Sequence, residues 1–263
     1  MKGFKEKTAV LTFDIESDWG GRAESVTAAD AVLPRLMETI EGAGVPATFF
    51  VNASILGACG GRLRALIGGK DHEISSHGLR HVEYGPLGPA VFKKELLDSK
   101  KILEDFFSST VKGYRAPRFS VTDRHFDILG ECGFSYDSSF CLNILSLKRF
   151  IRTFPGFNSR PHYRGGVLEV PVSHMKGIFL PAGLLWINLA GLRAFKLLLP
   201  GSPLVLYAHM FDFHADPQEY RVSAAKKIWY RAGRRGLYGT FSRTIAYLQA
   251  CGFIFRRMDS FLP

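Results

Sequence analysis

Two histidines stand four residues apart in the segment His77-Gly78-Leu79-Arg80-His81. On a helical turn, side chains at positions i and i+4 share a face, so both imidazoles could reach one metal ion. The same spacing also occurs by chance in many proteins, where the histidines serve only as core or surface residues. The pair therefore becomes a candidate metal site only if the chain supplies further ligands.

Two carboxylates, Asp14 and Glu16, directly follow the strand-like run Val10–Phe13. Alternate residues of a strand project from the same face, and two carboxylates placed together repel unless a cation or a partner accepts them. One carboxylate and two histidines make a catalytic metal set with an open position for water, and a second carboxylate can take the proton of that water. The alternative, solvated loop acids, explains poorly why both residues follow an apolar strand.

The rest of the chain alternates strand-like and helix-like segments. Short apolar runs predict strands, and apolar residues at helical spacing predict helices. We expect strands at Ala9–Phe13, Pro46–Val51, Glu73–Ser76, Val111–Arg115, Val167–Val172, Pro203–Tyr207 and Phe253–Arg256. We expect helices at Ala28–Glu41, Val91–Phe107, Arg124–Glu131 and Thr240–Ala250. This alternation predicts an α/β fold whose parallel sheet is either closed into a barrel or open and doubly wound.

The residues able to do chemistry fall at one end of these strands. Each lies at the C-terminal end of an apolar strand; they are Asp14, Glu16, His77, Arg115 and His209. In a parallel α/β barrel the carboxyl ends of the strands form the rim on which active sites are built. We therefore expect side chains from four distant strands to meet in one site.

Several segments resemble, in order, the motifs of the NodB-type polysaccharide deacetylases of carbohydrate esterase family 4. These segments are Thr12–Glu16, Asp71–Gly78, His77–His81, Arg115–Pro117, Gly133–Ser139 and Tyr207–His209. The resemblance covers positions 9 to 209, nearly the whole chain. Many members have two adjacent aspartates in the first motif. The Asp-x-Glu form found here resembles a branch with peptidoglycan, allantoin-related and exopolysaccharide-locus members.

The resemblance implies an α/β fold of the distorted (β/α)7 barrel type and metal-dependent hydrolysis of an N-acyl group. By position, Glu16, His77 and His81 would hold a divalent metal. Zn2+ is the expected ion, with Co2+ or Ni2+ as alternatives. The implied substrate is an N-acyl amino sugar used in cell-surface polysaccharide or lipopolysaccharide biosynthesis.

The resemblance also assigns catalytic roles by position. Asp14 would be the base, Arg115 would pair with it, and His209 would protonate the departing amine. Carboxylates and imidazoles are suited to such proton transfers near neutral pH. A backbone N–H at Arg118 or Phe119 would help to stabilise the oxyanion.

Some positions near this set differ from the residues usual in the family. Arg118 stands where many relatives have tyrosine, which suits an anionic group on the substrate. Tyr207 replaces the leucine that usually lines the acyl pocket, which favours a formyl or acetyl group. With Phe119 and Trp19 they form the predicted substrate-binding set. Asp212, shortly after the last motif, lines the pocket or lies in a surface loop.

The composition, with 46% hydrophobic and 22% charged residues, is typical of a globular protein with a large core. We expect one catalytic domain over residues 1–263, in which residues 215–263 form a basic C-terminal portion. The four cysteines form no CxxC pair, which is typical of reduced cytosolic proteins. Since no apolar signal region precedes the first predicted strand, we expect a cytoplasmic location, with the inner face of the membrane as a candidate contact.

The formal net charge is +10, and the excess is concentrated in residues 221–243. The stretch is either a solvated helix face or a surface for a membrane or for substrate phosphates. No nucleic-acid-binding motif accompanies it, so we expect no nucleic-acid partner. The apolar segment Gly177–Leu199 contains Arg193 and Lys196, which predicts a buried or interfacial helix and not a spanning one. A lipid- or nucleotide-linked sugar would explain both features, whereas nothing in the sequence indicates the oligomeric state.

Two other functions fit parts of the pattern. One is hydrolysis of an amide in a small nitrogen metabolite, which some relatives perform without a metal after losing part of the histidine set. Both His77 and His81 are present here, which favours the sugar deacylase. The other is a non-catalytic glycan-binding barrel, which would predict a disrupted site, yet Asp14, Arg115 and His209 are all in place.

Overall fold

The computed structural model describes residues 6–18, 25–122, 124–142, 159–177, 180–214 and 224–263. Its central strands are β1 (Thr8–Ile15), β2 (Ala47–Val51), β3 (Glu73–Ser76), β4 (Gly113–Tyr114), β5 (Tyr136–Asp137), β7 (Val167–Glu169) and β8 (Leu204–His209). Within the described residues, these strands pair in parallel in the order β7-β5-β4-β3-β2-β1-β8. Two short strands extend the sheet: β6 (His162–Arg164) is antiparallel to β7, and β9 (Ile254–Phe255) is parallel to β1.

The sheet curls, and its two ends are joined irregularly. Beyond β7, the backbone N–H of Ser173 donates to the carbonyl oxygen of Val205 in β8 at 3.1 Å, and Gly183 forms a bridge with Tyr207. In the part of the chain that the structure describes, no regular ladder connects β7 with β8. The predicted α/β fold with a distorted barrel of parallel strands is therefore confirmed.

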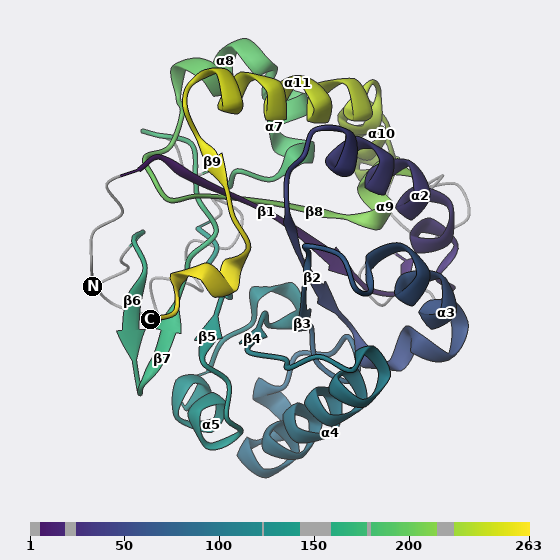
Figure 1. Ribbon diagram of the computed structural model, residues 1–263, viewed down its shortest axis with the longest axis vertical. Helices are drawn as coiled ribbons and strands as arrows, with labels where there is room; N and C mark the ends of the chain where they lie inside the picture. The colour runs from purple at the N-terminus through teal and green to yellow at the C-terminus, as the bar shows by residue number, and fades with distance from the viewer. Residues whose placement is uncertain (1–5, 19–24, 123, 143–158, 178–179, 215–223) are drawn as a thin grey trace.

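The helices pack around the outside of the curled sheet, as Figure 1 shows. They are α2 (Thr27–Gly42), α3 (Leu56–Ile67), α4 (Pro89–Phe107), α5 (His125–Glu131), α7 (Leu184–Ala190), α8 (Leu192–Leu197), α9 (Met210–Phe213), α10 (Ala224–Arg234) and α11 (Leu237–Ala250). The main core lies between helices and sheet, where the ring of Phe13 contacts those of Phe49 and Phe241. A second cluster, with Val10 and Phe50 among its members, fills the barrel interior.

The alternation of side chains along β1 explains how polar residues reach the rim. The odd-numbered residues from 9 to 15 face the helices and join the main core. Val10 faces the barrel interior, so Thr12 and Asp14 continue on that inner face toward the end of the strand. Glu16 follows directly after β1, and all three polar side chains are buried. A strand with an apolar outer face thus delivers two carboxylates to one end of the barrel.

The apolar segment 177–199 forms two short helices, α7 and α8, separated by Gly191 with a φ of +84°. Among the described residues, no helix has both the length and the apolar character that a membrane-spanning helix needs. The single helix expected here is therefore divided in two, and both helices pack on the core, through Leu184 and Ile187 of α7 and Phe195 of α8.

Candidate metal centre and active site

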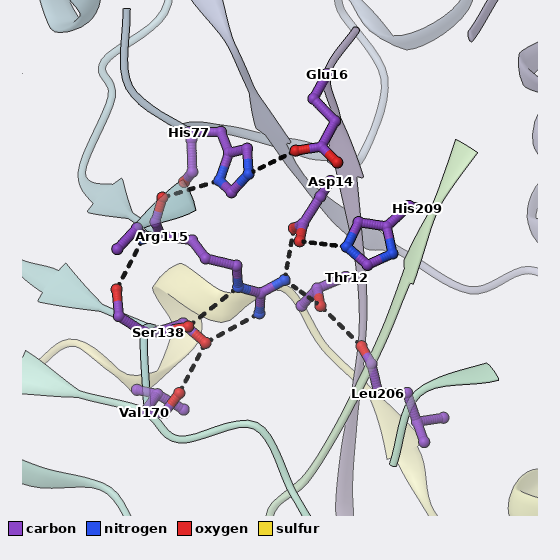
Figure 2. Close-up of polar contacts among 12 residues, drawn as sticks. Thr12, Asp14, Glu16, His77, Arg115, Ser138, Val170, Leu206 and His209 are labelled. Carbon is purple, nitrogen blue, oxygen red and sulfur yellow. Dashed lines mark hydrogen bonds and ion pairs between the residues drawn. The ribbon is translucent and has the colours of Figure 1, made fainter. Parts of the chain in front are cut away.

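Glu16, His77 and His81 converge on one point at the rim, where Figure 2 shows Glu16 and His77 pointing toward each other. Nε2 of His77 lies 3.0 Å from Oε2 of Glu16, and Nε2 of His81 contacts the same oxygen. One potential ligand atom from each residue lies within 4.8 Å of the other two. All three side chains are at most 5% exposed. Together they form a site that could hold a divalent metal ion.

The hydrogen bonds of His77 fit a cation at this point. Nδ1 of His77 lies 2.9 Å from the backbone carbonyl oxygen of Arg115, which can only accept, so Nδ1 carries a proton. In a neutral imidazole, Nε2 then has a lone pair, and this lone pair faces the oxygen of Glu16. Two acceptors, Nε2 of His77 and Oε2 of Glu16, would repel each other at 3.0 Å. The contact is favourable only if a second proton on the imidazole or a metal ion lies between them.

Glu16 itself carries a charge. Burial raises the pKa of Glu16, but the contacts with the His77 and His81 rings, which carry positive charge when protonated, lower it by more, so that the pKa lies well below its usual range. The ionised carboxylate and the two imidazoles are the mixed oxygen and nitrogen donor set of many catalytic zinc sites.

The histidine pair is not on a helix, contrary to the expectation from its spacing. His77 follows β3 directly, and residues 77–81 form a loop in which Gly78 has a φ of +83°. Asn52, buried at the end of β2, holds this loop in place. With its side-chain oxygen turned toward the His81 N–H (3.1 Å), its nitrogen faces the carbonyl oxygen of Leu79 (3.1 Å), which satisfies both groups. The two rings therefore converge because a loop turns back, and not because of helical periodicity.

Arg115 is fully buried and fixes Asp14, as the dashed lines in Figure 2 show. Its Nη1 donates to Oδ1 of Asp14 at 2.8 Å and to Oγ1 of Thr12 at 2.9 Å. Its Nε donates to the carbonyl oxygen of Ser138, and Nη2 donates to Oγ of the same serine, each at 3.0 Å. The guanidinium also stacks on the Phe50 ring, 4.1 Å from its centroid. Asp14 is thus oriented through one oxygen, which leaves Oδ2 turned toward His209.

His209, the last residue of β8, lies between two carboxylates. Its Nε2 is 3.7 Å from Oδ2 of Asp14, and its Nδ1 is 3.2 Å from Oδ2 of Asp212. The same oxygen of Asp212 accepts the backbone N–H of His209 at 2.9 Å, which caps α9. Burial lowers the pKa of His209, but Asp212, with smaller contributions from Glu16 and Asp14, raises it to about 9. His209 is therefore protonated at neutral pH.

The sequence left the position of Asp212 open between the pocket and a surface loop. In the structure Asp212 is buried behind His209. The available signal was the His-x-x-Asp spacing, which allows an N-terminal residue of a helix and the residue three positions later to cap each other.

The predicted substrate-binding residues are only partly brought together. The ring of Tyr207 lies against those of Phe119 (5.4 Å) and His209 (5.6 Å). Arg118 and Phe119 both have left-handed backbone conformations, with φ of 55° and 53°, a strain found often at active sites. The Arg118 side chain is about half exposed and lies 3.6 Å from Glu83. Trp19 lies outside the described residues.

The Phe119 amide is one of the two predicted oxyanion donors. It donates to the carbonyl oxygen of Ala116 at 2.9 Å within the turn after Arg115. An N–H engaged in the turn does not point at a reacting group, so this half of the prediction is not supported by the geometry. The Arg118 amide stays a prediction.

A comparison with protein-family models matches the family described as polysaccharide deacetylase over residues 2–136, just over half of the 263 residues. The chain belongs to this polysaccharide deacetylase family. The match includes the segments that contribute Asp14, Glu16, His77, His81 and Arg115. A comparison with curated proteins finds no match.

Several solved structures share the fold of the chain. A Mycobacterium smegmatis protein assigned to the polysaccharide deacetylases superposes with a TM-score of 0.68 at 20% identity, covering 99% of this chain and 91% of that one. Puue allantoinase superposes with a TM-score of 0.62 at 14% identity, covering 98% and 90%. A Bacillus anthracis pseudoenzyme of carbohydrate esterase family 4 gives 0.59 at 14% identity, covering 98% and 66%. The fold is therefore shared by proteins with different activities, and the site residues must carry the functional argument.

Proposed function

We propose that this chain is a metal-dependent hydrolase that removes an acetyl or formyl group from the nitrogen of an amino sugar. The observation that carries the proposal is the opposition of two acceptors, Nε2 of His77 and Oε2 of Glu16, beside an oriented Asp14. A cation bound between these two acceptor atoms would make their close approach favourable. The donor set of one carboxylate and two imidazoles favours Zn2+, with Co2+ or Ni2+ as alternatives.

The residues of the chain divide the work of amide hydrolysis between them. A bound divalent metal would polarise the acyl carbonyl group and make an attacking water more acidic. Oδ2 of Asp14 accepts the proton of that water, while Arg115 holds the other oxygen of the carboxylate. Nε2 of His209 gives its proton to the departing amine, so that the products are a carboxylate and a free amino group. The charge of Asp212 raises the pKa of His209, so the imidazole still carries that proton when the amine departs.

The substrate side of the proposal draws on the rings near His209. The buried ring of Tyr207 lies between Phe119 and His209, which favours a small acyl group over a long one. We propose a lipid- or nucleotide-linked amino sugar from a cytoplasmic stage of polysaccharide or lipopolysaccharide biosynthesis. The basic surface of the chain would suit the phosphate groups of either carrier.

The test is release of amine from a panel of soluble N-acetyl and N-formyl amino sugars, free and nucleotide-linked, with allantoin-type amides included. The protein is stripped with a chelator and reloaded with Zn2+, Co2+ or Ni2+ before the assay. We expect turnover of an amino sugar that needs the metal. Turnover of a small amide by the stripped protein would instead support the nitrogen-metabolite hydrolase.

Replacement of the base gives the matched comparison. We expect Asp14→Asn to lower kcat by about a thousandfold while the protein still binds metal. Asp98→Asn, on the outer side of α4, is the control and should keep full activity. A panel without any turnover, in wild-type protein with a full metal complement, would favour the non-catalytic glycan-binding barrel.

A further inference from the structure

Positive charge is strongly segregated along the chain. Segments 170–211 and 220–258 contain twelve lysines and arginines and no aspartate or glutamate, out of 34 basic and 24 acidic residues in total. The remaining residues therefore contain 22 basic and 24 acidic residues, so these two segments account for all of the net positive charge. Such a separation creates a field over one side of a molecule and not a uniformly basic surface.

The fold gathers the helices of these segments into one layer. α7 packs against α8, α10 and α11, and Figure 1 shows the four helices together along the upper side of the sheet. Exposed cations are found on three of them and on the connection after α10: Arg193, Lys196, Arg231, Arg235 and Arg243. We call the outer surface of α7, α8, α10 and α11 the basic face.

The basic face also carries the two most exposed large apolar side chains of the described residues. Leu197 at the end of α8 is 85% exposed, and Ile228 on α10 is 67% exposed. Beside Ile228, Trp229 is partly buried and its ring contacts that of Trp186 on α7 at 5.0 Å. Binding to the phosphates of a nucleic acid accounts for the cations but not for the exposed aliphatic side chains. A bilayer with anionic lipids accepts both, the cations at its headgroups and the apolar side chains below them.

The basic face borders the candidate active site. α10 packs on α9, the short helix that contains Asp212, and Tyr230 of α10 contacts the ring of Phe211 at 6.3 Å. Phe211 in turn stacks on His209 at 4.7 Å. A surface held against the basic face would therefore lie next to the rim of the barrel.

We propose that the basic face docks the protein reversibly on an anionic lipid bilayer, beside which the rim meets a lipid-linked amino sugar. The part that concerns the sugar rests on the proposed function, whereas the docking itself does not. Docking needs no spanning helix, because charge attraction and a few inserted apolar side chains are enough for weak, salt-sensitive binding.

The test is co-sedimentation of the full chain with vesicles of phosphatidylcholine alone or with about 30% phosphatidylglycerol, in low and high salt. We expect binding only to the anionic vesicles, lost in high salt. The double variant Arg231→Glu/Arg235→Glu should weaken binding by about tenfold or more. The control Lys94→Glu/Lys101→Glu makes the same change of net charge on the outer side of α4 and should leave binding nearly unchanged. Ile228→Ser should weaken binding to the anionic vesicles more than Leu97→Ser does, since Leu97 is an exposed leucine of α4, away from the basic face.

Circular dichroism and amine release from a soluble substrate show whether each variant is folded. Equal binding to neutral vesicles, or equal loss in the α4 control, would overturn the proposal. So would tighter, salt-sensitive binding to a short DNA duplex than to anionic vesicles, because the face would then serve nucleic acid. Vesicle binding without any deacylation would contradict only the proposed function, and deacylation without vesicle binding would contradict only the docking.

Discussion

Two buried glutamates lie at opposite ends of the barrel and differ in what surrounds them. Glu73 begins β3, and its carboxyl group accepts hydrogen bonds from Oγ1 of Thr48 (2.8 Å), the hydroxyl of Tyr136 (2.8 Å) and the backbone N–H of Asp259 (3.0 Å). Burial and the nearby charge of Asp259 raise the pKa of Glu73 to about 7. Glu16, at the rim, is buried to a similar extent, but its partners are two imidazoles and its pKa lies well below the usual range.

The difference shows that the partners, more than the burial, separate a structural carboxyl group from a candidate functional one. Neutral donors let Glu73 join β3 to the C-terminal segment in either protonation state. The imidazoles around Glu16 instead maintain a charge at a point where acceptors face one another, and such an arrangement costs stability unless a cation is bound.

The largest effect should come from matched removal of charge at the two glutamates. Glu16→Gln removes the anionic ligand, and we expect kcat/KM for amine release to fall by about a thousandfold or more. Glu73→Gln should stay within about twofold, because the hydroxyls of Tyr136 and Ser75 can accept from the new amide. Steady-state kinetics at saturating Zn2+ measures both. A similar loss in the two variants would show that Glu16, too, is only structural.

A smaller effect should follow from loosening the histidine loop. Asn52→Ala removes the acceptor of the His81 N–H, and we expect metal affinity to fall by about tenfold to a hundredfold. The kcat of the fully loaded enzyme should change little, since no catalytic group is altered. Chelator competition measures the affinity. The control is Asn188→Ala on α7, which removes a partly buried amide that donates to backbone carbonyls far from the site. Equal metal affinities in the two variants would show that Asn52 does not position the metal ligands.

Asp212→Asn tests the proton donor. The alkaline limb of the pH–rate profile reports loss of the proton from His209, whose pKa is about 9. Without the Asp212 charge, burial lowers this pKa, so the limb should move to lower pH by about one unit, with about a threefold loss of activity at pH 8.5. Asp127→Asn, in the first turn of α5, is the control. An unchanged alkaline limb would mean that another group gives the proton.

The smallest effect is on the free energy of unfolding and does not involve activity. Since the pKa of Glu73 is raised from 4.5 to about 7, its contribution to stability is fully present below pH 4.5 and is lost as the pH rises to 7. Urea unfolding should show that wild-type protein loses on the order of 2 kcal/mol more than Glu73→Gln between pH 5 and pH 8. Parallel curves for the two proteins would show that Glu73 keeps an ordinary pKa.

The rim residues could be predicted from sequence because their types are chemically distinctive and each directly follows an apolar strand. Asp14, Glu16, His77, Arg115 and His209 meet as their positions suggested, and the strand–helix alternation correctly predicted the fold. Their catalytic and metal-binding roles stay predictions, as do the single domain and the cytoplasmic location.

Other features depend on contacts that no local pattern contains. α3 has three glycines, which disfavour a helix, yet Gly60 lets the ring of Phe106 pack close to the helix, since a Cβ there would lie 2.8 Å from that ring. The loop that brings His81 back toward Glu16 depends on Gly78 and on Asn52 from another strand. A spacing of four residues indicated a helix, although the pair converges through tertiary contacts.

We propose that Glu16, His77 and His81 together hold one metal ion. Equilibrium dialysis against buffered Zn2+, followed by elemental analysis of wild type, Glu16→Gln and Glu73→Gln, tests it most directly. We expect one ion per chain in wild type and in Glu73→Gln, and none in Glu16→Gln at the same free Zn2+ concentration. One ion in all three proteins, or none in wild type together with full activity, would contradict it.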